Sequence, residues 1–143
     1  MSTVAVTLGV SLIDIAYKQV VLASTAKQSQ IGFYAADGAM ECALYWDQKF
    51  DAFDYASPMV NPQNTIRCGG NLVIWVSSAQ STVGGNHRKT VFDVRCAATG
   101  TNSNGRVTVY KYATGVTSIY ANGFSTCTAG DQRRVERGLK VFY

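Results

Sequence analysis

Proline is missing from a long stretch near the start of the chain. The 143 residues contain only two prolines, Pro58 and Pro62, so residues 4–50 have none. Because proline ends or kinks a helix, its absence lets one helix run through this whole stretch. That helix would be roughly 70 Å long, whereas a compact chain of this length has a radius of gyration of about 14–15 Å. One end is therefore expected to project into a membrane, a partner or copies of the chain itself.

Motifs for catalysis and for cofactor binding are also missing. The single histidine, His87, lies in a polar loop, and no GxSxG, P-loop or GxGxxG pattern occurs. The carboxylates of Asp37 and Glu41 share one helix face, where solvation or an ion pair between subunits is more typical than proton transfer. We therefore expect a protein that is not an enzyme and that has no cofactor or metal site.

Charged residues are scarce and unevenly distributed. They make up 15% of the chain, against 47% hydrophobic residues, which supports a sizeable core and argues against disorder. Residues 1–60 carry three basic and six acidic side chains, whereas residues 61–143 carry ten basic and three acidic ones. Such a basic region is most often a solvated surface, but it also suits nucleic acid or an acidic neighbouring subunit.

Four widely spaced cysteines indicate disulfides rather than a metal site. Cys42, Cys68, Cys96 and Cys127 fit no zinc-binding pattern, and their even number is typical of a domain in an oxidising compartment. Four cysteines allow three pairings, and four buried free thiols are the alternative. Our hypothesis is Cys42 with Cys68 and Cys96 with Cys127, because Cys68 follows the loop after the helix and Cys127 can reach the end of an earlier strand.

The first part of the helix is apolar. Between residues 1 and 16 only Asp14 is charged, and Lys18 is placed to pair with it at i, i+4. Sixteen residues make about 24 Å of helix, less than the roughly 30 Å core of a bilayer. The stretch resembles the lower half of a membrane helix, with a buried core helix as the alternative. The expected helix-packing positions are Leu8, Leu12, Ile15 and Leu22.

The second part of the helix is expected to pack against a sheet. An apolar stripe at helical spacing consists of Leu22, Ala26, Phe33, Ala36, Met40, Ala43 and Leu44. Polar residues occupy the other faces: Lys27, Gln28, Gln30, Asp37, Glu41 and Asp47. The aromatic residues near the helix end are expected in the core: Phe33, Tyr34, Tyr45, Trp46 and Phe50.

The rest of the chain predicts an antiparallel sheet. Residues 51–70 read as a connecting loop, and β-rich runs separated by turn residues follow it. The expected strands are residues 72–78 (an inner strand), 90–96, 106–112, 116–120 and 133–143, with a loop at 79–89 and turns at Asn104-Gly105 and 113–115. Basic residues should lie mostly on the exposed face and in loops, among them Arg88, Lys89, Arg106, Lys111, Arg133, Arg134 and Arg137. The prediction is an α+β fold, with a long helix (1–50) on a head of about five strands (51–143).

This plan resembles that of type IV pilins. Residues 24–47 resemble the helix of PilX-like minor pilins, in which a polar segment leads into an aromatic-Tyr-Ala-Ala-acid run followed by a glutamate. Phe33, Tyr34, Asp37 and Glu41 match that motif, while Gly38 comes one place early. The basic leader, the peptidase-cleaved glycine and the following Phe-Thr-x-x-x-Glu of pilins are absent, so we expect a truncated chain or a start further upstream.

The resemblance implies a structural role. The chain would be a minor pilin or pseudopilin of a type IV pilus or a related secretion system. It would be anchored in the inner membrane and then assembled into a cell-surface filament through helix packing with copies of itself or other pilins. The alternative is a binding or adhesive module, in which the basic sheet face and nearby tyrosines engage DNA or a ligand on a host or other surface.

Overall fold

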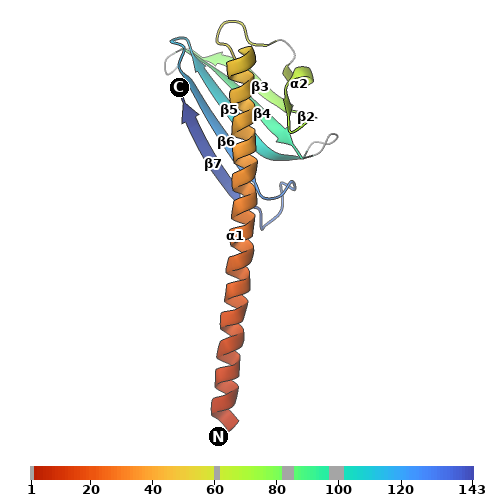
Figure 1. Cartoon of the computed structure of the whole chain (residues 1–143), viewed down its shortest axis with the longest axis vertical. Helices are drawn as coiled ribbons and strands as arrows, with labels where there is room; N and C mark the ends of the chain where they lie inside the picture. Colours follow the sequence, from red (N-terminus) through yellow and green to blue (C-terminus); the bar gives the residue numbers. More distant parts are fainter. Residues whose placement is uncertain (1, 60–61, 82–85, 97–101) are drawn as a thin grey trace.

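The molecule consists of one long helix and a sheet head attached to the far end of that helix. The computed structural model describes residues 2–59, 62–81, 86–96 and 102–143, and leaves aside the side chains of residues 2–9, 11 and 63. Helix α1 spans Ser2–Phe50, so it is about 74 Å long, and its N-terminal half extends well beyond the sheet (Figure 1). The predicted continuous, projecting helix is confirmed.

The sheet is a five-stranded antiparallel meander, which confirms the predicted α+β fold. Its spatial order follows the sequence, with each strand paired to the next. The strands are β3 (Ile74–Ser81), β4 (His87–Arg95), β5 (Ser103–Tyr112), β6 (Thr117–Phe124) and β7 (Glu136–Phe142). Helix α1 lies across β6, with β5 and β7 on either side (Figure 1).

Several strand boundaries differ from those predicted. Residues 72–78 were expected to form an inner strand, but β3 is an edge strand of the sheet. Much of the expected loop at 79–89 belongs to β3 and β4. The Asn104-Gly105 pair lies inside β5 rather than in a turn, whereas the turn at 113–115 is present. The apolar run at residues 72–78 therefore does not mark a central strand. The Asn104-Gly105 pair has a role in β5 other than forming a turn.

The connecting segment after α1 covers the part of the sheet that the helix leaves open. Instead of an irregular loop, it holds a short helix α2 (Pro62–Thr65) and a small hairpin of β1 (Arg67–Cys68) and β2 (Asn71–Leu72). Phe53 is fully buried and stacks on Phe92 at 5.6 Å between ring centroids, while Trp75 lies on the same ring. The core therefore extends from α1 across the sheet to β3.

Small residues, rather than large ones, face the sheet along α1. Gly32, Ala36, Ala39 and Ala43 are buried, and Met40 is the only large apolar member of this stripe. The predicted stripe was right for Ala36, Met40 and Ala43 but wrong for the exposed residues Leu22, Ala26 and Phe33, and Leu44 is only partly buried. A stripe of small side chains lets the helix axis approach the strands closely, which leaves the bulky residues on other faces.

Two glycines in the strands make the same close approach possible. A Cβ added at Gly123 would meet backbone atoms of Gly32 and Ala36, and one added at Gly105 would lie 3.2 Å from the Cβ of Ala39. Glycine inside a strand often marks such an approach by another backbone. Gly105 is thus explained by helix packing and not by a turn.

Candidate interaction surfaces

The projecting part of α1 presents large apolar side chains over most of its circumference and the Asp14–Lys18 pair on the remaining side. Every large apolar side chain described there is 45–71% exposed: Val10, Leu12, Ile13, Ile15, Tyr17, Val20, Val21 and Leu22. Successive helix residues are about 100° apart, so the run from Val20 to Leu22 alone spans about 200° of the helix circumference. We call residues 10–22 the stalk. A helix that exposes apolar side chains over most of its circumference is normally covered by other groups, so we expect the stalk to have a partner.

The predicted packing positions and ion pair lie in or beside the stalk. Leu12 and Ile15 are exposed on it, whereas the side chain of Leu8 falls outside the described residues. The Nζ of Lys18 donates to Oδ2 of Asp14 at 2.8 Å, as predicted from their spacing. This pair provides the only charges among residues 10–26, and each neutralises the other, which lowers the cost of surrounding the stalk with apolar groups.

The residues of the pilin-like motif lie on faces of α1 turned away from the core. Phe33 and Tyr34 are exposed and pack edge-on with ring centroids 6.1 Å apart. Asp37 and Glu41 are exposed as well, and no hydrogen bond or ion pair links them to other described side chains. The expectation that the helix aromatics lie in the core was wrong for Phe33 and Tyr34 and for the exposed Tyr45 and Phe50, whereas Trp46 is half-buried and packs against the core.

A buried charged cluster fixes the upper end of α1 to the sheet. Asp47 was assigned to an outer face, but only 2% of it is exposed. Its Oδ2 accepts hydrogen bonds from Nζ of Lys111 at 2.8 Å, from Oη of Tyr143 at 2.7 Å and from Oγ1 of Thr117 at 3.5 Å. Partial burial, together with the bond to Asp47, raises the pKa of Tyr143. This cluster connects α1 with β5, β6 and the residue after β7.

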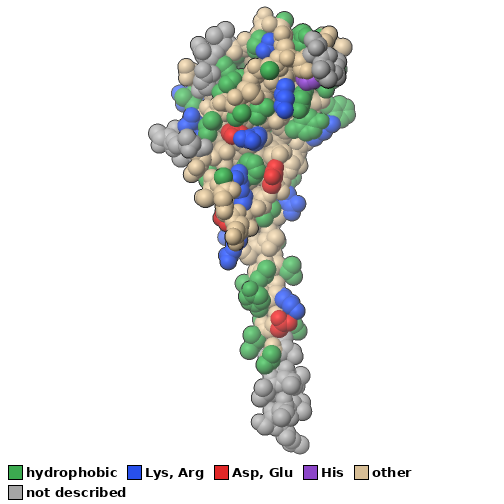
Figure 2. All heavy atoms as spheres, turned by 180° about the vertical axis from the view of Figure 1, so that it is seen from behind, with side chains coloured by type: hydrophobic (Ala, Val, Ile, Leu, Met, Phe, Trp, Pro, Cys, Tyr) green, Lys and Arg blue, Asp and Glu red, His purple; other side chains and the backbone are tan. Residues whose placement is uncertain are grey.

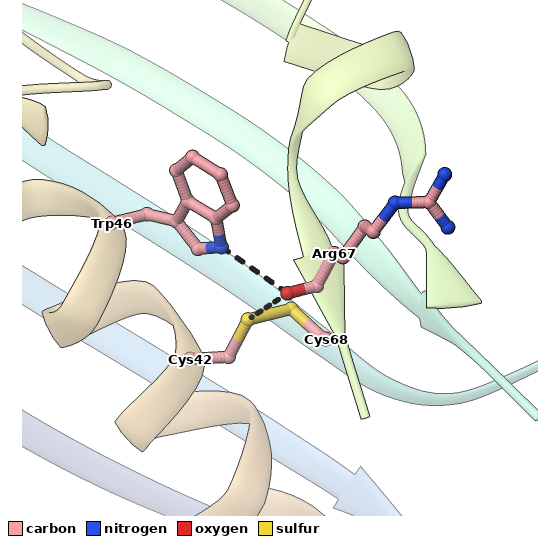
Figure 3. Close-up of a disulfide and its surroundings, with 4 residues drawn as sticks. All are labelled: Cys42, Trp46, Arg67 and Cys68. Atoms are coloured by element: carbon pink, nitrogen blue, oxygen red, sulfur yellow. Dashed lines mark hydrogen bonds between the residues drawn. A yellow bond between two sulfur atoms is a disulfide. The ribbon is translucent and has the colours of Figure 1, made fainter. Parts of the chain in front are cut away.

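Two disulfides staple the head. They join Cys42 to Cys68 and Cys96 to Cys127, the pairing of our hypothesis. Figure 3 shows the first of them between α1 and β1, where Nε1 of Trp46 donates to the carbonyl oxygen of Arg67 at 3.2 Å. The Sγ of Cys42 lies 3.4 Å from the same oxygen, a contact rather than a hydrogen bond because a disulfide sulfur carries no proton. The hairpin is thus held to the helix by a covalent and a polar link.

The basic residues do not form a single surface. Alternation along the strands turns Arg88, Lys111 and Arg137 toward the helix side, where they bind Tyr55 O, Asp47 and Ser29. Lys111 is only 14% exposed, so its assignment to the exposed face was wrong. In Figure 2, which views the molecule from behind, the blue Lys and Arg side chains are scattered over the head with red acidic groups among them.

The outer face of the sheet instead carries tyrosines with a few cations. Tyr110 and Tyr120 pack edge-on at 5.7 Å, with Lys89 and Lys140 near their rings. Arg106 is paired with Asp93 through two hydrogen bonds of 2.7 and 2.9 Å, and this pairing raises the pKa of the guanidinium. A shallow hollow of about 300 Å³ lies over this region. Arg106 is the only charged residue in the lining of this hollow, and Asp93 neutralises it.

A second hollow lies where the stalk meets the head. The loop between β6 and β7 extends below the sheet beside α1 (Figure 1) and, with the helix, encloses about 600 Å³. We call it the stalk groove, and its lining is Tyr17, Val20, Val21, Ser24, Thr25, Gln28, Gln132, Arg133, Arg134 and Val135. The predicted basic residues Arg133 and Arg134 are thus brought together here. Arg134 is held over the ring of Phe124 at 3.7 Å, while Arg133 is exposed.

Sequence reasoning missed Asp47, Tyr143 and the close-approach glycines. The signal for the glycines was present, since Gly105 and Gly123 interrupt runs that otherwise suit strands. Asp47 gave no comparable signal, because its partners lie 64 to 96 residues further along the chain. Long-range polar pairs of this kind are invisible to periodicity.

In the part of the chain that the structure describes, no helical segment combines the length and hydropathy needed to cross a bilayer. No group of three or more His, Cys, Asp or Glu side chains described by the structure is arranged to hold a metal ion.

Comparison with known proteins adds no relative. No protein-family model, curated protein or solved structure matches the chain.

Proposed function

We propose that the chain is a structural subunit of a type IV pilus or a related secretion filament, as a minor pilin or pseudopilin. The observation that carries the proposal is the stalk, which exposes large apolar side chains over most of its circumference and projects beyond the sheet (Figure 1). Burying apolar surface contributes about 25 cal/mol per Å², so a bundle of parallel stalks supplies a strong drive to assemble. Copies of this chain or other pilins are the expected partners.

The head has features expected of a domain outside the cytoplasm. Structural disulfides are typical of oxidising compartments, and the two here hold the end of α1 and the loop between β6 and β7. The motif residues Phe33, Tyr34, Asp37 and Glu41 lie on exposed faces of α1, where neighbouring subunits in a filament can contact them. Anchoring in the inner membrane before assembly, and a place on the cell surface afterwards, follow from the same proposal.

The binding-module alternative has less support. A DNA-binding face needs several unpaired cations along one surface, because phosphate neutralisation supplies most of the affinity. Here Arg88, Lys111 and Arg137 bind groups on the helix side and Arg106 is paired with Asp93, which leaves Lys89 and Lys140 beside the tyrosines of the outer face. The filament role is therefore the function that we put forward.

The proposal is tested by asking whether the stalk brings the chain into surface filaments. In cells that produce the protein, the variant Leu12→Asn/Ile15→Asn makes two exposed stalk positions polar. The matched control Val76→Asn/Val116→Asn makes the same kind of change at exposed positions of the head, which are 49% and 46% accessible. Filaments are sheared from the cells, and the chain is quantified in the sheared and cell-associated fractions by mass spectrometry.

The wild-type chain and the head control should be found in the filaments. The stalk variant should fall at least about tenfold in that fraction while keeping both disulfides, since a tenfold change needs only about 1.4 kcal/mol. A wild-type chain missing from sheared filaments contradicts the proposal, and so does a stalk variant that enters them as well as the control.

A further inference from the structure

The stalk groove and the outer face of α1 are complementary in charge. The groove is lined by apolar side chains, by neutral polar ones and by two arginines, and no acidic residue is in its lining. The nearby Asp131 accepts a hydrogen bond from the backbone N–H of Arg133, which leaves the Arg133 side chain available. The guanidinium of Arg134 is fixed over Phe124. The groove is thus a preformed basic and apolar site.

Two polar atoms in the groove are buried without a partner among the described residues. They are Oε1 of Gln28 and Nε of Arg134. Buried polar groups are nearly always hydrogen-bonded, so such atoms need an explanation such as water or a ligand. Both residues line the groove, but the two atoms are covered by the chain itself, so the cation that a partner can reach there is the exposed Arg133.

The acidic group that fits the groove is on α1 itself. Asp37 and Glu41 lie one helical turn apart on exposed faces, with Tyr34 and Tyr45 exposed beside them. Neither carboxylate is bonded to another described side chain. An aromatic and acidic ridge of this kind matches a hollow formed by Tyr17, valines and arginines.

The ridge cannot fill the groove of its own molecule, because it lies further along the same straight helix. We propose that the stalk groove of one copy receives the Tyr34–Tyr45 ridge of a second copy, with Arg133 and Arg134 facing Asp37 and Glu41. This rests on the proposed function and specifies how neighbouring subunits meet.

The arrangement fixes the relation between the two copies. The middle of the ridge is about 17 residues beyond the middle of the groove, so the second copy is displaced by about 25 Å toward the first copy's N-terminus. Its sheet lies on the opposite side of its helix from the ridge, so that sheet does not obstruct the contact. Since the two surfaces differ, the contact is head-to-tail and repeats into an open filament rather than closing as a symmetric dimer.

The test mixes two variants of the full chain, each with one extra thiol. Gln132→Cys places a thiol on the groove, and Gly38→Cys places one on the ridge, where a Cβ meets nothing within 4 Å. Mild oxidation of the mixture should give a disulfide-linked heterodimer, while each variant alone should remain unlinked. The control mixture of Val116→Cys with Gly38→Cys should give none, because Val116 precedes β6 at the end of the sheet near Asp47.

Charge reversal separates specific pairing from mere proximity. Adding Arg133→Glu to the groove variant, or Glu41→Arg to the ridge variant, should each lower the heterodimer yield about tenfold, and the two reversals together should restore it. Yields that do not change with either reversal overturn the inference. So does a linkage of groove thiol to groove thiol, which indicates a symmetric contact.

The outcomes also separate this inference from the proposed function. A chain that enters sheared filaments through its stalk but never forms the groove-to-ridge link refutes the inference and leaves the filament role standing. A chain that forms the link but is missing from filaments supports the pairing and refutes the filament role.

Discussion

Replacing Gly123 with alanine tests the packing that leaves the bulky side chains of α1 exposed. A Cβ at this position overlaps backbone atoms of Gly32 and Ala36 and would lie 2.8 Å from the carbonyl carbon of Ala35. Because the obstacle is helix backbone, no side-chain rotation relieves it. Carbon atoms pack best at about 3.5 Å or more, so the helix must move away by at least about 0.7 Å.

The cost can be worked out from what that movement separates. Ala36, Ala39, Met40 and Ala43 are the apolar side chains that α1 buries on the sheet. At about 0.8 kcal/mol per buried methyl and about 2 for methionine, they contribute roughly 4 kcal/mol. A gap of this size loses about a quarter to a half of the contact energy, and overpacking adds about 1–3 kcal/mol of strain. We expect Gly123→Ala to lower the free energy of unfolding by about 3 kcal/mol.

The assay is urea unfolding of the oxidised full chain, followed by the fluorescence of Trp46 and Trp75. The matched control is Gly38→Ala, the same substitution at an open helix position. It should raise the free energy of unfolding by up to about 1 kcal/mol, since glycine is a poor helix former. A free energy of unfolding for Gly123→Ala within about 0.5 kcal/mol of the wild-type value would mean that α1 does not cross β6 this closely. Close packing would then not explain why the bulky faces of α1 are exposed.

Three further predictions concern the links between helix and sheet. Cys42→Ser/Cys68→Ser should lower the free energy of unfolding by about 3 kcal/mol in urea, while peptide mapping of the wild-type protein should find no free thiol at these positions. Asp47→Ala should lower the free energy of unfolding by about 3–5 kcal/mol because it leaves the Lys111 charge buried, and Asp47→Leu/Lys111→Met should recover most of that loss. Equal losses of unfolding free energy in the two variants would argue against a buried ion pair. The raised pKa of Tyr143 means that the unfolded state ionises first above pH 10, so stability should fall there as pH rises, and Tyr143→Phe should show a smaller fall in pH-dependent unfolding.

The parts of the fold that follow from local sequence were predictable. A proline-free stretch gave the helix and its length, and the position of each cysteine relative to helix and strands was enough to suggest the observed pairing. The face of the helix that meets the sheet was not predictable in the same way. Hydrophobic periodicity gives most weight to residues such as Leu22 and Phe33, whereas close packing on β6 selected Gly32 and Ala36.

The candidate site was hard to predict for a related reason. An apolar residue that is buried between subunits has the same sequence signature as one that is buried within a subunit. Tyr34 and Tyr45 were therefore assigned to the core, although they are exposed on a single chain. The prediction of a basic surface was wrong for a different reason. Strand alternation divides the basic residues between the two faces of the sheet, and only the fold shows which of them lie close together.

The most direct test of the filament role is a reconstruction, by electron cryomicroscopy, of filaments sheared from cells that produce the chain. We expect the stalks of successive subunits to be packed together along the filament axis, with the sheet heads outside and Arg133 of one subunit close to Glu41 of the next. Filaments that lack this chain, or that contain it with its stalk exposed to solvent, would contradict the account.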